Sequence, residues 1–201
     1  MLERALREAG CDPRGRTVLD VGCGTGFFTG YYLGRGCGQL TGVDIAPTSV
    51  ERLSQRHPEA HFRLADIGSD PIDGRFDLVN AFDVLYHITD DTRWERAVNH
   101  LARAVASQGM LLLTDTFADL PRLAEHNVMR PLPRYRDLLG ANGLEVQAIY
   151  PTHVLLNREL GPFRPLNRLP GLLYAADRVL LGLGFGHGPS VSKLLVAKRK
   201  R

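Results

Sequence analysis

Short apolar runs alternate with helical stretches along most of this 201-residue chain. Each run is followed by a turn and a segment of helical character, and this alternation is typical of βαβ units around a parallel sheet buried on both faces. The length suits one domain, residues 1–201. Strands are expected at residues 17–21, 39–43, 60–65, 76–82, 110–114, 144–150 and 192–197.

One helix has a much stronger pattern than the others. Its apolar residues recur at the three-and-four spacing of a single buried face. A capping box of Thr92 and Glu95 is the expected start, and Gly109 is expected to end the connection to the next strand. The buried face comprises Trp94, Ala97, Val98, Leu101 and Val105. Further helices are expected at residues 2–8, 27–33, 47–57, 133–141 and 172–181.

Composition excludes several classes of protein. Hydrophobic residues make up 44% and charged residues 23%, which is the usual globular mix and excludes a disordered or fibrous chain. The net charge of +3 is too small to argue for a nucleic-acid partner. Three cysteines, a charged first segment and the lack of 18 uninterrupted apolar residues indicate a cytoplasmic protein with free thiols and no membrane span.

The segment VLDVGCGTG, residues 18–26, carries the most functional information. Its alternating glycines, Gly22, Gly24 and Gly26, let a strand turn sharply into a helix while the backbone approaches a ligand. Such loops bind adenosine-containing cofactors. Phe27 stands where the third glycine of a dinucleotide-binding motif belongs, and this disfavours a nicotinamide-dependent oxidoreductase.

Two aspartates follow the glycine loop at the ends of successive strands. Asp44 ends the second expected strand, where a carboxylate accepts hydrogen bonds from ribose hydroxyls, and Asp66 ends the third. Either residue alone is as easily a helix cap or a loop carboxylate. Both together, behind this glycine loop, favour a ligand site at the carboxyl ends of the strands.

The glycine loop preceded by Asp20, with Asp44 and Asp66 in register, resembles motif I and the following acidic positions of the class I S-adenosylmethionine-dependent methyltransferases. The resemblance covers residues 18–113 and extends more loosely to the end. It implies a Rossmann-like three-layer α/β sandwich, with a seven-stranded sheet in the order 3-2-1-4-5-7-6 whose last strand alone is antiparallel. It also implies S-adenosyl-L-methionine as the cofactor.

The resemblance also assigns roles within the cofactor site. The glycines would pass under the methionine part, Asp20 would hold the loop and the ammonium end, and Ile45 would pack on the adenine. Asp66 would accept a hydrogen bond from the adenine amino group, and the Ile67 N–H would donate to the ring. The expected cofactor-binding residues are Asp20, Gly22, Cys23, Gly24, Gly26, Asp44, Ile45, Asp66, Ile67 and Phe82.

The segment after the fourth strand, residues 80–88, indicates the acceptor class. It lacks the Asn- or Asp-Pro-Pro-Tyr loop of base-modifying enzymes and resembles small-molecule methyltransferases. His87 is the candidate general base, although it would equally shape the pocket alone. Tyr86 and Asp115 are candidate acceptor contacts, and no metal-ligand spacing is present. We therefore expect methylation of a small molecule, hydrophobic or anionic, at oxygen ahead of nitrogen or carbon.

Residues 118–132 and an insert at 155–190 are expected to cover the acceptor, with arginines of the insert at the rim of the pocket. The helix of this insert would pack on the core in preference to a membrane, through Leu172, Leu173, Ala176, Val179 and Leu180. We expect a monomer or homodimer without nucleic-acid partners. The alternatives are a cofactor-binding scaffold without turnover and, less favoured, the oxidoreductase.

Overall fold

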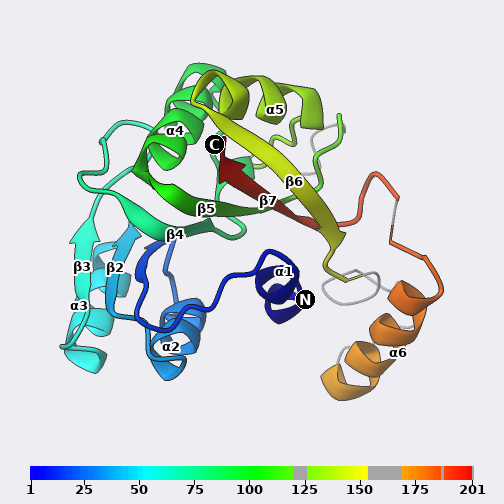
Figure 1. Ribbon diagram of the computed structural model, residues 1–201, viewed down its shortest axis with the longest axis horizontal. Coiled ribbons are helices and arrows are strands. Elements are labelled where there is room, and N and C mark those ends of the chain that lie inside the picture. Colours follow the sequence, from blue (N-terminus) through cyan, green and yellow to red (C-terminus); the bar gives the residue numbers. More distant parts are fainter. Residues whose placement is uncertain (120–125, 154–168, 187, 201) are drawn as a thin grey trace.

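The computed structural model describes residues 1–119, 126–153, 169–186 and 188–200, and these form a seven-stranded sheet with helices on both faces (Figure 1). The strand order is β3-β2-β1-β4-β5-β7-β6. β7 is antiparallel to both of its neighbours, and the other pairs are parallel. The predicted fold class, strand order and antiparallel last strand are confirmed.

The elements follow the predicted alternation. The strands are β1 (Thr17–Val21), β2 (Gln39–Asp44), β3 (His61–Leu64), β4 (Phe76–Ala81), β5 (Val105–Asp115), β6 (Leu144–Pro151) and β7 (Lys193–Arg199). The helices are α1 (Leu2–Glu8), α2 (Phe27–Gly34), α3 (Pro47–Arg56), the short 3₁₀ helix η1 (Leu85–His87), α4 (Asp91–Ala104), α5 (Leu132–Ala141) and α6 (Pro170–Gly182).

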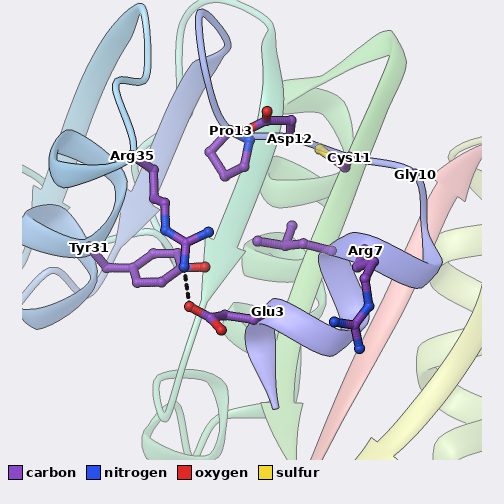
Figure 2. A pocket seen from close by; sticks show the side chains of 9 residues that line it. Glu3, Arg7, Gly10, Cys11, Asp12, Pro13, Tyr31 and Arg35 are labelled. Atoms are coloured by element: carbon purple, nitrogen blue, oxygen red, sulfur yellow. Dashed lines mark hydrogen bonds and ion pairs between the residues drawn. The ribbon is translucent and has the colours of Figure 1, made fainter.

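Helices α1 and α2 cover one face of the sheet. Ala5 and Leu6 of α1 and Tyr32 of α2 are buried there against alternate residues of the strands. A cavity of about 380 Å³ opens between the two helices, and Glu3 and Arg35 pair across it (Figure 2). The residues that line this cavity include none of the expected cofactor or acceptor residues.

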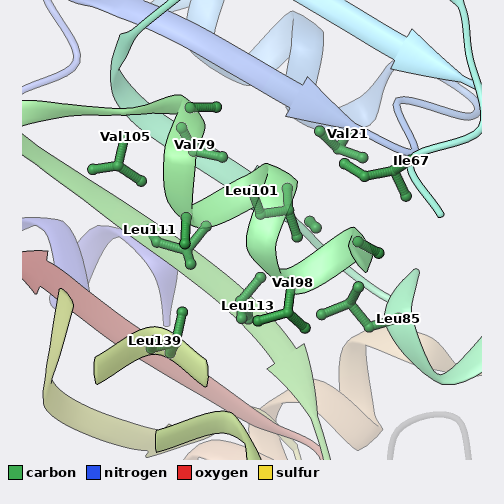
Figure 3. Close-up of a cluster of buried hydrophobic side chains, with 14 of the residues drawn as sticks. Val21, Ile67, Val79, Leu85, Val98, Leu101, Val105, Leu111, Leu113 and Leu139 are labelled. Carbon is green, nitrogen blue, oxygen red and sulfur yellow. The ribbon is translucent and has the colours of Figure 1, made fainter. Parts of the chain in front are cut away.

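Helices α4 and α5 cover the opposite face and form the larger core (Figure 3). Successive residues of a strand point to opposite faces, so in β5 Leu111 packs under α4 and Leu112 faces α1 and α2. Both are fully buried. Each such leucine stabilises the fold by about 1.5–3 kcal/mol. This double-sided burial fixes the sheet, whose carboxyl ends carry the site.

The start of α4 differs from the prediction. Asp90, and not Thr92, is the N-cap, and its side chain accepts a hydrogen bond from the Arg93 N–H at 2.8 Å. The expected capping box of Thr92 with Glu95 is therefore wrong. The stretch Thr89-Asp90-Asp91-Thr92 consists of four residues that all favour caps. Its sequence alone does not select among them.

The end of α4 and the start of β5 also differ. The helix ends at Ala104, and Val105 begins a strand that runs through Gly109 to Asp115. Val105 is therefore a strand residue, and Gly109 lies within β5 instead of ending a connection. A Cβ at Gly109 would lie 2.7 Å from the Phe76 carbonyl oxygen, so glycine is required by close approach of two strands.

Helix α6 does not bury the face that we expected. Of the five residues predicted to face the core, Leu173 is buried, whereas Leu172 and Val179 are 56% and 62% exposed. Asp177, one turn after Leu173, shares its buried position. The expectation that this whole face packs on the core is wrong. Part of the proposed acceptor cover, including Arg158, Arg164 and Arg168, lies outside the described residues.

Candidate cofactor and acceptor site

A cavity of about 440 Å³ lies at the carboxyl ends of the central strands. This volume is within the range of small-molecule sites, and open α/β sheets bind ligands at this edge. Six of the residues predicted from the sequence line it together: Gly22, Asp44, Ile45, Asp66, Ile67 and His87. The cavity is the candidate site.

The glycine loop approaches the cavity with backbone that only glycine adopts readily. Gly22 has a φ of 69°, and a Cβ there would lie 2.3 Å from Cγ2 of Val84. Gly26 has a φ of 84° and is the N-cap of α2. A Cβ at Gly26 would lie 2.4 Å from Leu53. The loop is thus shaped by φ and by close packing at both ends.

Asp20 supports this loop from below the cavity. It is 1% exposed, and its two carboxylate oxygens accept hydrogen bonds of 2.8 Å from the Thr29 hydroxyl of α2 and the Asn80 amide of β4. Burial raises the pKa of Asp20, against the opposite effect of these two hydrogen bonds. The structure therefore ties the loop to α2 and β4 through Asp20. Its expected contact with an ammonium group stays a prediction.

Asp44 connects β2 to the glycine loop. Its Oδ2 accepts a hydrogen bond from the Gly24 N–H at 2.8 Å, and its Oδ1 accepts one from the Ala46 N–H at 2.9 Å. Each carboxylate oxygen has a second lone pair, so both oxygens keep the capacity to accept from ribose hydroxyls. Ile45 beside it is 67% exposed and offers an apolar surface to a flat ring.

Asp66 is paired within the protein. Its Oδ2 accepts a hydrogen bond from the guanidinium of Arg93, and its Oδ1 accepts one from the Gly68 N–H at 2.9 Å. Ile67 is held by its carbonyl, which lies 2.9 Å from Nδ1 of His100. Among the described residues, the Ile67 N–H has no hydrogen-bond partner. This free donor at the cavity fits the predicted contact with an adenine ring.

Five expected cofactor residues do not line the cavity: Asp20, Gly24 and Gly26, described above, and Cys23 and Phe82. Cys23 is buried in the loop beside Gly42, and burial raises its pKa to about 12, so the thiol stays protonated and unreactive. Phe82 packs against Phe28 of α2, with ring centroids 4.4 Å apart. Both are placed as packing residues around the site, and a direct contact with a cofactor stays a prediction.

The helix η1 carries the candidate acceptor residues. His87 is exposed at the cavity. Its ring packs at a tilt against that of Tyr86, with centroids 4.4 Å apart, and is stacked with that of His126 at 6.0 Å. Burial, with Asp83 and Asp115 nearby, raises the pKa of Tyr86 to about 12. Its phenol is thus a neutral hydrogen-bond donor at physiological pH.

Asp115 lies at the end of β5 but faces inward. It is 1% exposed, and its carboxylate accepts hydrogen bonds from the Tyr135 hydroxyl and the Thr116 N–H. Burial raises the pKa of both Asp115 and Tyr135. Their pairing joins β5 to α5. The predicted contact between Asp115 and an acceptor is untested, and the side chain is committed to this internal pair.

Asp83 and Arg93 line the cavity and were not among the predicted site residues. Asp83 has a φ of 57°, in the left-handed region, and forms two hydrogen bonds with Thr114. An acidic residue just after a central strand was a visible signal for it. Arg93 lies in a segment with a strong helical pattern, and nothing else in the sequence marks it as a site residue.

Arg130 was also missed, although it holds one wall of the cavity. It is 1% exposed and donates to the carbonyls of Ile88 and Val128 and to the Asp91 carboxylate. Its guanidinium lies 4.7 Å from the Trp94 ring centroid. Because Ile88 lines the cavity, this buried cation positions the wall without entering the site.

The described residues contain no group of three histidine, cysteine, aspartate or glutamate side chains that could hold a metal ion. No helix within them is long and apolar enough to span a bilayer. All three cysteines are free thiols.

Residues 18–109 match the family model of a methyltransferase domain. The O-methyltransferase cnsE of Penicillium expansum is 31% identical over 129 residues, which are 59% of this chain and 46% of that protein. The tRNA U34 carboxymethyltransferase of Shewanella halifaxensis is 38% identical over 78 residues, 36% of this chain and 24% of that protein. The chain thus spans about a quarter to half of these relatives.

Among solved structures, the N-methyltransferase NodS of Bradyrhizobium japonicum in complex with S-adenosyl-L-homocysteine has the same fold. Its TM-score is 0.68 at 18% identity, covering 99% of this chain and 85% of that one. The fold and the matched segment thus define a methyltransferase domain. Residues 18–109 match this domain family, and the chain has the fold of the class I S-adenosylmethionine-dependent methyltransferases.

Proposed function

We propose that the chain binds S-adenosyl-L-methionine and transfers its methyl group to a small-molecule acceptor. The observation that carries the proposal is the single cavity that joins the Gly22 loop, Asp44 and the free Ile67 N–H. Oxygen as the methylated atom, a cytoplasmic location and the acceptor cover at 118–132 and 155–190 stay predictions.

The residues present fit the cofactor. Gly22 lines the cavity without a side chain, so its backbone is open to a methionine chain. Asp44 retains acceptor capacity for a ribose, and exposed Ile45 flanks the place of a ring. The bound cofactor supplies a methyl group on a positively charged sulfur. The protein contributes orientation, since holding an acceptor in line with that methyl group lowers the barrier through proximity.

His87 is the proposed proton acceptor. It is exposed at the cavity next to the glycine loop and Val84, where a hydroxyl or ammonium acceptor has to lose a proton. Tyr86, as a neutral donor, would orient the acceptor. In this proposal the side of the cavity with Asp44 and Ile67 binds the nucleoside, and the residues of η1 contact the acceptor.

Replacing Asp44 should weaken cofactor binding. Asp44→Ala removes hydrogen bonds to ribose and releases the Gly24 N–H, so we expect a loss of about 1–3 kcal/mol in S-adenosyl-L-homocysteine affinity. Titration calorimetry measures the change. Asp73→Asn, at an exposed carboxylate paired with Arg63, is the matched control and should bind normally. Unchanged affinity in Asp44→Ala would refute the ribose assignment.

Replacing His87 should separate turnover from binding. His87→Ala should lower the rate of methyl transfer by about 10²-fold or more if His87 takes the proton, with cofactor affinity nearly intact. His61→Ala, at an exposed position in β3, is the control. Full turnover in His87→Ala would leave His87 as a residue that only shapes the pocket.

A turnover assay distinguishes the enzyme from a binding scaffold. The protein is incubated with S-adenosyl-L-methionine and a pool of small metabolites, and S-adenosyl-L-homocysteine is measured against protein concentration. Product in excess of protein supports the enzyme. Cofactor binding without product above background across phenols, amines and amphiphilic metabolites would favour the scaffold.

A further inference from the structure

We infer that Asp83 is the acceptor-binding residue and that it selects an amine nitrogen. This inference rests on the proposed function and assigns its substrate class. Asp83 lines the same cavity as Gly22 and His87, and its carboxylate is exposed there. The cation that lines the cavity, Arg93, is already paired with Asp66.

The strand order places Asp83 at the methyl-transfer end. Asp44 ends β2, and Asp66, Gly22 and Asp83 follow β3, β1 and β4. In the sheet these strands are successive neighbours in the order β3-β2-β1-β4. Neighbouring strands lie about 4.8 Å apart, so Asp83 is roughly 14 Å along the edge from Asp66. With the nucleoside held at β2 and β3, Asp83 lies beyond the glycine loop, on the acceptor side.

The backbone and Thr114 fix the direction of the Asp83 side chain. A φ of 57° is uncommon for a residue other than glycine, and such conformations concentrate at functional sites. The Thr114 hydroxyl accepts from the Asp83 N–H at 2.8 Å and donates to Asp83 Oδ1 at 3.0 Å. Within the described residues, Oδ2 has no hydrogen-bond partner. One oxygen is therefore anchored, and the other is available to a ligand.

A carboxylate at this place is complementary to amine methylation. The acceptor enters as an ammonium, pairs with Asp83 and loses one proton to His87, which passes it to water. The nitrogen lone pair then forms the N–C bond while the methyl carbon–sulfur bond breaks, and sulfur keeps the bonding pair as a neutral thioether. Positive charge moves from sulfur to nitrogen, so Asp83 stabilises the charge where it develops.

The same carboxylate disfavours an oxygen acceptor. A phenol or acid is methylated as its anion, and an adjacent anion raises the cost of forming that species. The Tyr86 phenol is neutral and adds no further charge beside the acceptor, so it is compatible with a nitrogen acceptor. Asp83 thus favours nitrogen over the oxygen expected from the sequence.

Sinefungin tests this inference without a known acceptor. It is an S-adenosyl-L-methionine analogue in which a carbon bearing an ammonium replaces the methylated sulfur, so it presents a cationic nitrogen at the transfer position. We expect wild-type protein to bind sinefungin more tightly than S-adenosyl-L-homocysteine. Asp83→Asn should reduce sinefungin affinity about ten-fold or more, as for loss of a charged hydrogen bond, and change S-adenosyl-L-homocysteine affinity less than about two-fold.

Variants at Asp83 and Thr114 separate loss of the carboxylate charge from damage to the backbone. Asparagine tolerates a left-handed φ, so Asp83→Asn preserves the backbone and its Thr114 bonds. Thr114→Val should lose part of the sinefungin preference, and Thr114→Ser should keep it. Equal losses for both ligands, or no loss for sinefungin, would overturn the assignment of Asp83. Failure of wild-type protein to bind either ligand would instead overturn the proposed function.

Discussion

Gly22→Ala should strongly weaken cofactor binding and destabilise the fold. A side chain at a φ of 69° costs about 1–2 kcal/mol, and its Cβ would lie 2.3 Å from Cγ2 of Val84. Valine is stiff at χ1, so relief requires movement of the loop or of the segment before η1. We expect a loss of about 2 kcal/mol in the free energy of unfolding. Affinity for S-adenosyl-L-homocysteine should fall more than about ten-fold.

Gly30→Ala is the matched control for that variant. Gly30 lies inside α2, and a Cβ there meets no atom of the described residues within 4 Å. Alanine in a helix interior is favoured over glycine by about 0.5–1 kcal/mol, so Gly30→Ala should stabilise the protein and bind cofactor normally. Denaturant unfolding and calorimetry measure both variants. Normal binding by Gly22→Ala would contradict the account of the glycine loop.

Arg130→Met should be the most destabilising change of a charged residue that we consider. The buried guanidinium bonds to the carbonyls of Ile88 and Val128 and to Asp91 and stacks on Trp94. Methionine replaces the packing but leaves these acceptors without their donor. We expect a loss of about 3 kcal/mol in the free energy of unfolding, measured by chemical denaturation.

Arg134→Met provides the comparison because its surroundings are similar but more exposed. Arg134 also bonds to Asp91 and lies 4.9 Å from the Trp94 ring centroid, yet its side chain is 34% exposed. Its loss should cost about 0.5 kcal/mol. Equal effects of the two substitutions would show that burial of Arg130 does not matter. Weaker cofactor binding in Arg130→Met would be consistent with its hold on Ile88.

The sheet could be predicted because every strand has a pattern of its own. Runs such as residues 17–21 and 76–82 are apolar on both faces, as central parallel strands are, and the strand order came with the resemblance to the family. Boundaries were less secure. Val105 is buried at the start of β5, and it would equally be buried at the end of α4. Hydrophobic periodicity therefore did not separate α4 from β5. Asp90 competed with three neighbouring residues that also favour caps.

For the site as well, local sequence patterns predict some residues and miss those whose partners are distant in the chain. Gly22, Asp44 and Ile67 could be predicted because their places follow from one motif and from the ends of strands. Arg130 and Thr114 could not, because their partners are 39 and 31 residues away in the chain, and sequence spacing does not encode such contacts. Phe82 was placed in the cofactor site by resemblance, whereas its ring faces α2.

The most direct test of the central claim is parallel calorimetric titration of the protein with S-adenosyl-L-methionine, S-adenosyl-L-homocysteine and NAD. The account predicts saturable one-to-one binding of the two sulfur-containing ligands and none of NAD. Binding of NAD alone, or of none of the three, would contradict the assignment of the cavity to this cofactor.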